Sequence, residues 1–478
     1  MSTYLFYDLE TTGLNRAFDQ VLQFAAIKTD MSFNEIDRHE IRIRLRPDVI
    51  ISPHAIITHR IPIHDAASGI PEFEATQQIH ALLNEPGTIS LGYNSLGFDD
   101  EFLRFSFHRN LLPPYTHQYS NGCRRMDILP ITVIYKLYNR DILTWPDNNG
   151  KPSLKLEDLS AANNLASGRS HDAMTDVEAT RELARKLQNS HKMWDYLAES
   201  FIKNVDQKRV NQLPVSFQTG EGIHRLGLMT GSEFGAKLGY QVPVLSIGNS
   251  IPYANQSLWL RTDLPELKTA ESENISDTTW VIRKKYGEPG IILPPLERYW
   301  KCIDKERRQC AEENLEWLKS NPDMLQRIIS YHREFRYPFI PDIDADAALY
   351  QAGFLPREAE VLCRKFHLSS NGEKAELIAS FPTHETRILA GRVIARNYPE
   401  YASNNIQTKF SHYMKCINPE NPDDAIIDYR GEKRRTPSSA LADIDQLKKS
   451  SELGPKLDNE QIELIKDLEQ YIIKKFRK

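Results

Sequence analysis

The order of apolar segments in the first 185 or so residues is the feature that most constrains the fold of this chain. Short apolar runs typical of strands alternate there with stretches of helical periodicity. The strand-like runs are 4–7, 21–27, 41–45 and 88–92, and the helix-like stretches are 73–83 and 99–109. This alternation predicts an α/β domain in which helices pack against one sheet.

The remaining residues have a different sequence pattern from the first domain. Between about 190 and 340, prolines separate short β-rich runs, which predicts a small barrel-like domain. The last 130 or so residues are helical in pattern and close with an amphipathic helix from about Asp458. Because 478 residues exceed what one hydrophobic core usually covers, we expect three domains.

The composition excludes several classes of protein. Sixty lysines and arginines against 65 aspartates and glutamates give a net charge of −5, so the chain lacks the basic signature of a protein that coats nucleic acid. The five cysteines include no C-x-x-C pair, which argues against a disulfide framework or a zinc site and favours a reducing cytoplasm. With neither a signal peptide nor an apolar run of about 18 residues, we expect a cytoplasmic protein without a membrane span.

Asp8 and Glu10 follow the apolar run of the first expected strand. Residues two apart on a strand share a face, so the two carboxylates point the same way and could bind one metal ion. A simple turn at the strand end is the plainer interpretation, because Asp-x-Glu is a common sequence. Desolvation favours the metal, since a buried strand does not ordinarily end in two unpaired carboxylates.

Three more polar residues lie where helices are expected to begin. Asp99 starts the helix over 99–109, a position that the helix dipole favours for an acidic residue with or without a function. His171 and Asp176 flank Asp172, which we predict to be the N-cap of the following helix. Residues five apart on a continuous helix point about 140° apart, so the two converge only if His171 belongs to the entering loop. A surface histidine remains the plainer alternative.

In combination, these residues resemble the DEDD exonuclease superfamily, histidine subtype. The matching residues, in order, are Asp8, Glu10, Asp99, His171 and Asp176. The tyrosine subtype would have a tyrosine four positions before the last aspartate, where this chain has Asp172. A ligand set made only of oxygens suits Mg²⁺ or Mn²⁺ and argues against zinc.

The resemblance implies hydrolysis of a phosphodiester with two Mg²⁺ ions per active site, for which Mn²⁺ is a possible substitute. Asp8, Glu10 and Asp176 would hold the ion that activates water, and Asp8 and Asp99 would hold the second ion. His171 would be the general base, a role suited to an unperturbed pKa near 6.5. Glu10 would also contact the 3′-OH of the terminal nucleotide, which gives 3′→5′ polarity.

Further phrases resemble the bacterial exodeoxyribonuclease I family. These phrases are Gln23–Ile27, Gly92–Asn94, Phe98–Glu101, Trp145–Pro146 and Ser170–Met174. The resemblance is sharp over 6–182 and rests on order and size beyond that range. It implies a ribonuclease H-like exonuclease domain with a mixed sheet over 1–188, an SH3-like domain with a β-barrel over 192–343, and an α-helical domain over 345–478.

The same resemblance implies an activity and partners. The activity is Mg²⁺-dependent, processive 3′→5′ degradation of single-stranded DNA to 5′-mononucleotides in DNA repair and recombination, by a monomer. The second partner is the acidic C-terminal tail of single-stranded DNA-binding protein, for which the cations at 307–308 and 433–435 are candidate sites. Arg104 and Lys155 are expected to contact phosphates near the active site. Lys155 stands where relatives carry arginine, and it lacks the bidentate fork.

Cations and aromatic residues also interleave at 283–286 and 298–301. This pattern is typical of sequence-independent binding to single strands, although a solvated β-domain surface explains it equally well. Two other functions stay open. The first is the same chemistry on RNA or on mismatched primer ends, and the second is nucleic-acid binding by a decayed nuclease, which the five intact residues disfavour.

Overall fold

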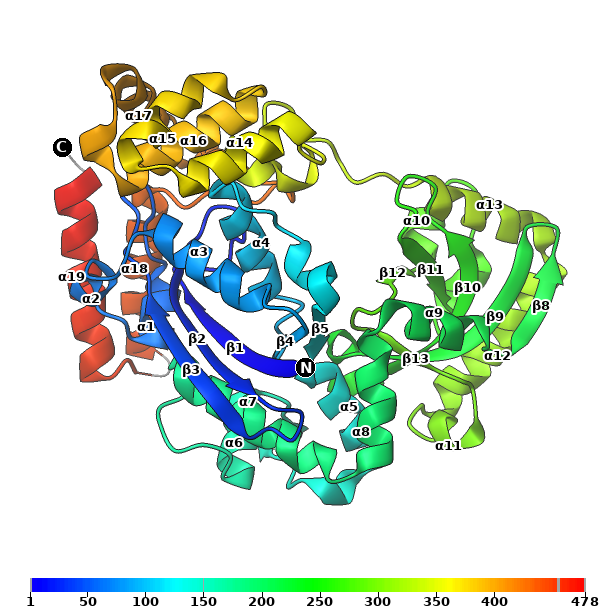
Figure 1. Ribbon diagram of the computed structural model, residues 1–478. Coiled ribbons are helices and arrows are strands. Elements are labelled where there is room, and N and C mark those ends of the chain that lie inside the picture. Colours follow the sequence, from blue (N-terminus) through cyan, green and yellow to red (C-terminus); the bar gives the residue numbers. More distant parts are fainter. Residues whose placement is uncertain (1, 149, 454–455, 477–478) are drawn as a thin grey trace.

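The computed structural model describes residues 2–148, 150–453 and 456–476. Figure 1 shows three parts: a central domain with a sheet, a β-rich domain beside it, and a group of helices on another side. We call them the N-terminal domain, the SH3-like domain and the helical domain. They confirm the fold class predicted from the sequence. Within the described ranges, no helix is both long and apolar enough to cross a bilayer.

A five-stranded mixed sheet in the order β3-β2-β1-β4-β5 forms the centre of the N-terminal domain. Its strands are β1 (Thr3–Thr11), β2 (Val21–Thr29), β3 (Glu35–Arg42), β4 (Thr88–Gly92) and β5 (Arg124–Asp127), and a separate short hairpin pairs β6 (Asp147–Asn148) with β7 (Lys151–Pro152). β1 runs antiparallel to β2, with Asp8 opposite Ala25, and parallel to β4, with Phe6 opposite Leu91. β1 and β2 are almost entirely buried because helices cover both faces of the sheet.

The helices of the N-terminal domain surround this sheet. They are α1 (Pro53–His59), α2 (Ile63–Ala66), α3 (Glu72–Leu83), α4 (Asp99–Arg109), α5 (Ile128–Tyr138), α6 (Leu156–Asn163), α7 (Ala173–Gln188) and α8 (His191–Ala198). Ile79 and Phe102 of α3 and α4 pack on one face of the sheet, and Ile131 and Val177 of α5 and α7 pack on the other.

Most of the expected elements occur where the sequence predicts them, but the third strand ends early. The prediction extends it to Leu45, whereas β3 ends at Arg42 and Ile43 makes only a single bridge to Ile70. The reason is the register: Arg42 lies opposite Gln23, and β2 begins at Val21, so β2 offers only two more positions, and the Arg44 N–H already donates to the Ile70 carbonyl instead.

The SH3-like domain contains a six-stranded sheet in the order β12-β11-β10-β9-β13, with β8 paired to β9. Its strands are β8 (Val215–Thr219), β9 (Gly222–Thr230), β10 (Gln241–Asn249), β11 (Gln256–Arg261), β12 (Val281–Lys285) and β13 (Ile291–Leu293). Its helices are α9 (Lys203–Asn211), α10 (Ile275–Thr278), α11 (Glu297–Trp300), α12 (Lys305–Ser320) and α13 (Pro322–Glu334). Asn321 is the N-cap of α13 and Pro322 is its first residue, although the Asn321 side chain makes no capping hydrogen bond.

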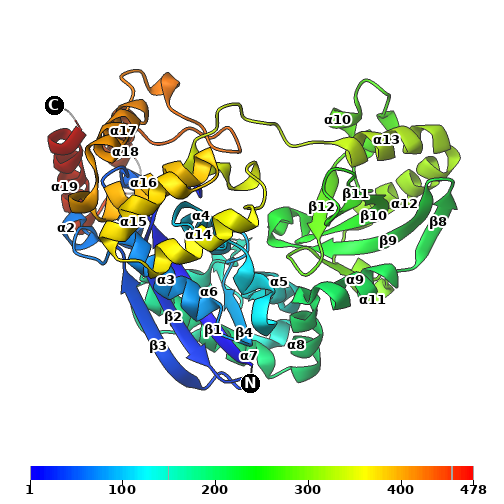
Figure 2. The same ribbon diagram turned by 45° about the horizontal axis from the view of Figure 1, so that its top comes forward.

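The helical domain packs on the N-terminal domain. Its helices are α14 (Arg357–Leu368), α15 (Asn371–Leu377), α16 (His384–Asn397), α17 (Asn404–Cys416), α18 (Pro437–Leu453) and α19 (Asn459–Phe476). Ile444 of α18 and Leu468 of α19 join a core with Ile56 of α1. α19 confirms the amphipathic helix predicted from about Asp458. The segment 336–343 crosses from α13 to this domain (Figures 1 and 2).

The exact domain limits stay predictions. Trp194 and Leu197 of α8 belong to the same core cluster as Leu183 and Leu187 of α7, so the N-terminal core extends beyond residue 188.

Candidate active site

β1 carries Asp8 and Glu10 to one end of the central sheet. Their spacing of two places both side chains on one face of the strand. The register of β1 against β2 shifts between Glu10 and Thr11, and this bulge ends regular pairing directly after the two carboxylates. Glu10 is buried and Asp8 is partly exposed.

Two helix starts bring further carboxylates to the same end. Asp99 is the first residue of α4, which follows β4; because β4 runs parallel to β1, the residues after both strands meet at one edge of the sheet. Asp176 lies in the first turn of α7. The predicted N-cap is confirmed: the Asp172 side chain accepts a hydrogen bond from the backbone N–H of Thr175 at 3.2 Å.

A cavity of about 840 Å³ lies at this edge, and Asp8, Glu10, Asp99, His171 and Asp176 all line it. The structure therefore brings together all five residues of the predicted catalytic set. The remaining wall comes partly from the N-terminal domain and partly from residues 422–439 of the helical domain. The fold thus contributes two domains to a single site.

The carboxylates in this cavity are poorly compensated. Burial raises the pKa of Asp8, Glu10 and Asp99 well above the usual range, and repulsion from neighbouring carboxylates adds to the effect. Burial also raises the pKa of Asp176 to about 6, although the nearby His171 lowers it. In the described part of the chain, none of the four forms an ion pair with a lysine or arginine. When ionised, these carboxylates therefore carry uncompensated negative charge, which attracts cations.

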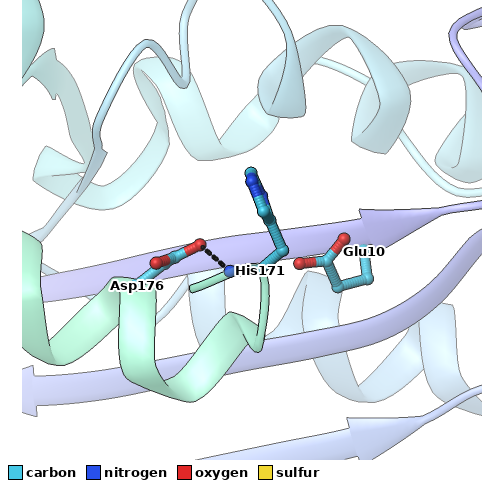
Figure 3. A group of neighbouring side chains, drawn as sticks. All are labelled: Glu10, His171 and Asp176. Carbon is cyan, nitrogen blue, oxygen red and sulfur yellow. Dashed lines mark hydrogen bonds between the residues drawn. The ribbon is translucent and has the colours of Figure 1, made fainter. Parts of the chain in front are cut away.

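His171 lies in the loop that enters α7, as its convergence with Asp176 requires. Its backbone is in the left-handed region, with φ of 61°, and its N–H donates to Oδ2 of Asp176 at 3.2 Å. One ligand atom from each of Glu10, His171 and Asp176 lies within 4.8 Å of the others. Figure 3 shows the two carboxylates on either side of His171, whose ring projects away from the line between them.

Glu157 of α6 holds the ring of His171. The imidazole Nε2 lies 3.1 Å from Oε2 of Glu157. A carboxylate accepts hydrogen bonds, so this contact assigns the proton of the neutral imidazole to Nε2 and leaves Nδ1 as a proton acceptor. Glu157 thus orients the candidate base and sets its tautomer.

Lys155 and Arg104, the two cations predicted to contact phosphate, have different surroundings. Lys155 is exposed and pairs with Glu157 at 3.1 Å, which places it one contact away from His171 but outside the cavity wall. Arg104 is buried and pairs with Asp100 at 2.5 Å, and its guanidinium lies over the ring of Tyr115. The structure does not bring Arg104 into the cavity, because the i,i+4 partner Asp100 holds it elsewhere.

In the other predicted basic surfaces, many side chains are also buried or already contact partners within the protein. In the SH3-like domain, Lys284 is buried against Asp206 and Trp300 is buried, whereas Arg283 lies over Phe335. Exposed aromatic side chains do occur close by in the sequence, at Trp280, Phe335, Tyr337 and Phe339. The candidate partner sites carry ion pairs of their own, as in Arg307–Asp263, Arg308–Glu297 and Lys433–Asp423, and Arg434 is buried.

Comparisons with known proteins agree with this geometry. A family model described as "Exonuclease" matches residues 5–184. Exodeoxyribonuclease I of Escherichia coli is 29% identical over 444 residues, which cover 88% of this chain and 90% of that protein. The chain is a relative of exodeoxyribonuclease I. It is an enzyme of this exonuclease type. Exodeoxyribonuclease I of Haemophilus influenzae is also similar, with 33% identity over 231 residues, which are 48% of each chain.

The fold likeness to exonuclease I extends over the whole chain. The crystal structure of E. coli exonuclease I in complex with a dA16 oligonucleotide superposes with a TM-score of 0.84, covering 99% of this chain and 100% of that one at 24% identity. All three domains of the chain therefore have counterparts in exonuclease I.

Two residues near the site were missed from the sequence. Glu157 has no spacing relation to His171, from which it is separated by 14 positions. Arg169 lies close enough to Glu10 to lower its pKa, although burial raises that pKa more. The only sequence signal for either was its closeness to a residue already singled out: Glu157 is two residues from Lys155, and Arg169 is two from His171.

Proposed function

We propose that this chain is a Mg²⁺-dependent, processive 3′→5′ exonuclease that degrades single-stranded DNA to 5′-mononucleotides in DNA repair and recombination. The observation that carries this proposal is the set of four carboxylates around one cavity, with no lysine or arginine paired to any of them among the described residues. The likeness to exodeoxyribonuclease I over all three domains supports the substrate class. We propose that the enzyme acts as a cytoplasmic monomer.

The donor set fits hard divalent cations. Asp8, Glu10, Asp99 and Asp176 offer only oxygen atoms, and in the metal-free chain their pKa values are raised by burial and mutual repulsion. Asp8, Glu10 and Asp176 would hold one Mg²⁺ and Asp8 and Asp99 a second, with Mn²⁺ a possible substitute. When bound, the two ions would lower the pKa of the attacking water and stabilise the leaving 3′ oxygen.

The side chains of the site have separate tasks in this proposal. His171 takes the proton of the attacking water on Nδ1, because Glu157 holds the proton on Nε2. Glu157 fixes the ring direction while that proton is transferred. Glu10, which is buried beside the base, accepts a hydrogen bond from the 3′-OH of the terminal nucleotide, and this contact selects the 3′ end.

The SH3-like domain supplies a surface for the rest of the strand. Arg283 stacks over Phe335 with 4.5 Å between the guanidinium carbon and the ring centroid, and Trp280, Tyr337 and Phe339 are exposed. Aromatic faces and cations of this kind bind bases and phosphates without regard to sequence. We also propose the acidic tail of single-stranded DNA-binding protein as a partner; its site is not assigned to any residue.

Digestion of single-stranded DNA, duplex DNA and RNA side by side, with Mg²⁺ or with a chelator, tests the proposal. We expect rapid release of 5′-mononucleotides from single-stranded DNA alone, and only with the metal. A preference for RNA or for mismatched primer ends would replace the substrate assignment. For polarity, labelled strands carrying a 3′- or a 5′-phosphate are compared; protection by the 5′ block alone would show the opposite direction.

A further inference from the structure

Three consecutive acidic residues begin α4, and their side chains go to three different parts of the molecule. Asp99 lines the catalytic cavity. Asp100 is buried and pairs with Arg125, which in turn reaches the SH3-like domain, and Glu101 bonds to the helical domain. The first turn of α4 therefore links to both accessory domains through the two residues that directly follow Asp99.

Asp100 is the centre of a buried ion network that reaches the SH3-like domain. Its Oδ2 is 2.5 Å from Nη2 of Arg104 and 2.6 Å from Nη1 of Arg125, and its Oδ1 is 2.8 Å from Nε2 of His117. The second arm of Arg125 donates from Nη2 to Oε1 of Glu288 at 3.2 Å. Glu288 lies in the turn between β12 and β13, so Arg125 joins the SH3-like domain to the residue after Asp99.

Glu101 is held by the helical domain. Its Oε1 accepts hydrogen bonds from the hydroxyls of Tyr429 at 2.6 Å and Tyr350 at 3.2 Å, and its Oε2 is 2.8 Å from Nη2 of Arg430. These three partners come from the segments before α14 and before α18. Glu101 is thus bound to the helical domain as Asp100 is bound, through Arg125, to the SH3-like domain.

The start of α4 has no side-chain cap, because its N-cap position is Phe98. Its first backbone N–H groups bond to backbone carbonyls instead: Asp100 donates to Ser95 at 2.9 Å and Glu101 donates to Phe98 at 3.2 Å. The side-chain contacts of Asp100 and Glu101 add to these bonds in fixing the position of the first turn. Because Asp99 shares that turn, a displacement of Asp100 or Glu101 moves the Asp99 carboxylate as well.

We propose that Asp100 and Glu101 are positioning residues that couple the SH3-like and helical domains to the Asp99 carboxylate. A strand that binds both domains fixes their separation, and the first turn of α4 converts this separation into the placement of Asp99. Hydrolysis then depends on a strand that is held along its length. The inference rests on the proposed function, in which Asp99 is a metal ligand.

Two substitutions each remove one contact that links an accessory domain to the start of α4, and neither changes a residue of the cavity wall. Glu288→Gln removes the ion pair with Arg125, and Tyr429→Phe removes the hydrogen bond to Glu101. Two matched controls remove contacts inside one domain. Glu313→Gln breaks the ion pair with Lys268 in the SH3-like domain, and Tyr471→Phe breaks the hydrogen bond from Lys475 within α19.

Three measurements separate positioning from strand binding. The first is turnover of the p-nitrophenyl ester of thymidine 5′-monophosphate, a single nucleotide that is too short to span the two accessory domains. The second is kcat and KM on a long oligodeoxynucleotide, and the third is calorimetric titration of Mn²⁺ without substrate. We expect Glu288→Gln and Tyr429→Phe to lower kcat on both substrates and to weaken Mn²⁺ binding by about 2- to 30-fold. The two control variants should match the wild type.

The result that overturns the coupling is a rise in KM for the long strand with ester turnover and Mn²⁺ affinity at the control level, because the contacts would then serve strand binding alone. Thermal unfolding of each variant shows whether lost activity reflects lost folding, and the Mn²⁺ titration is restricted to variants that melt like their controls. Asp99→Asn tests the proposed function separately. If that variant digests DNA normally, Asp99 has no catalytic role, whatever the coupling variants show.

Discussion

Two buried clusters of carboxylates in this molecule are built from the same residue types and have opposite electrostatics. In the cavity of the candidate active site, burial and mutual repulsion raise the pKa values of Asp8, Glu10 and Asp99. At the junction of the N-terminal and helical domains, the cluster that we call the junction cluster contains Asp48 and Asp346. Burial would raise the pKa of these two as well, but their arginines hold it far below the usual range.

The arginines of the junction cluster explain the difference. Arg396 lies 2.5 Å from Asp346 and 2.8 Å from Asp48, and Arg434 lies 3.3 Å from Asp48. The protein thus pairs both junction carboxylates with arginines, whereas none of the four cavity carboxylates forms an ion pair with a lysine or arginine that the structure describes. A buried charge is tolerated only if it is paired, so in our proposal cations from solution compensate the cavity carboxylates. One cluster serves folding, and we propose that the other binds ions.

The largest expected effect comes from neutralising a cavity carboxylate. Asp8→Asn should lower the rate of DNA hydrolysis at least about 10³-fold, because the metal site loses its shared ligand. The same change should leave the stability of the metal-free protein unchanged or raise it, since one source of repulsion disappears. Hydrolysis assays and thermal unfolding in chelator measure the two effects.

Binding of single-stranded DNA is the control for Asp8→Asn and should persist, because the accessory domains are untouched. Near-normal Mg²⁺-dependent digestion by this variant would remove Asp8 from the mechanism. A large fall in the melting temperature of the metal-free variant would show that the cavity contributes to folding in the way the junction does.

At the junction, we expect a substitution to lower stability and leave activity unchanged. Asp48→Asn leaves three arginines around a neutral side chain, and breaking a buried ion pair costs about 3–5 kcal/mol of stability. The folded fraction at low temperature should retain wild-type activity, because Asp48 does not line the cavity. Denaturant unfolding and hydrolysis assays on the same sample test this. An Asp48→Asn protein as stable as the wild type would contradict the comparison.

The local pattern around the cavity was predictable from the sequence. The strand period places Asp8 and Glu10 on one face, and the cap residue Asp172 ends the loop that carries His171. Both follow from spacing within a few residues. The resemblance to a nuclease superfamily then assembled residues as distant as Asp8 and Asp176 into one site.

The ion pairs that the folded chain forms were not predictable, and they determine which cations are exposed. Arg104, for which a phosphate contact stays a prediction, pairs with Asp100, and only the i,i+4 spacing of the two residues hinted at this pairing. Arg434 belongs to a run of three cations that suggested a docking surface, yet it is buried beside Asp48. A sequence shows which side chains are charged but not which of them another domain will cover.

A third way to bury an ionisable group is to keep it neutral, and His332 of α13 is an example. Burial, with a smaller effect of Arg283, lowers its pKa to about 4, and its Nε2 lies 2.7 Å from the hydroxyl of Thr279. The unfolded chain, with a pKa near 6.5, binds the proton more readily. Stability from this group is therefore fully present above pH 6.5 and is lost as the pH falls towards 4, by about 3 kcal/mol.

His332→Gln provides the check on this value. The glutamine cannot be protonated, so the difference in unfolding free energy between wild type and variant should shrink as the pH falls from 7 to 5. Equal pH dependence of the two proteins would show that His332 is not the group that titrates.

The smallest expected effect is stabilisation by the metal itself. Because no lysine or arginine in the part of the chain that the structure describes pairs with the cavity carboxylates, Mn²⁺ or Mg²⁺ at about 100 times its dissociation constant should stabilise the folded protein by about 2.7 kcal/mol. Thermal unfolding at increasing Mn²⁺ concentration measures this stabilisation. Asp8→Asn should lose most of it, whereas Asp48→Asn, less stable at the outset, should gain as much as the wild type does. If both variants respond equally to Mn²⁺, the ion binds outside the cavity, and the uncompensated carboxylates are not its ligands.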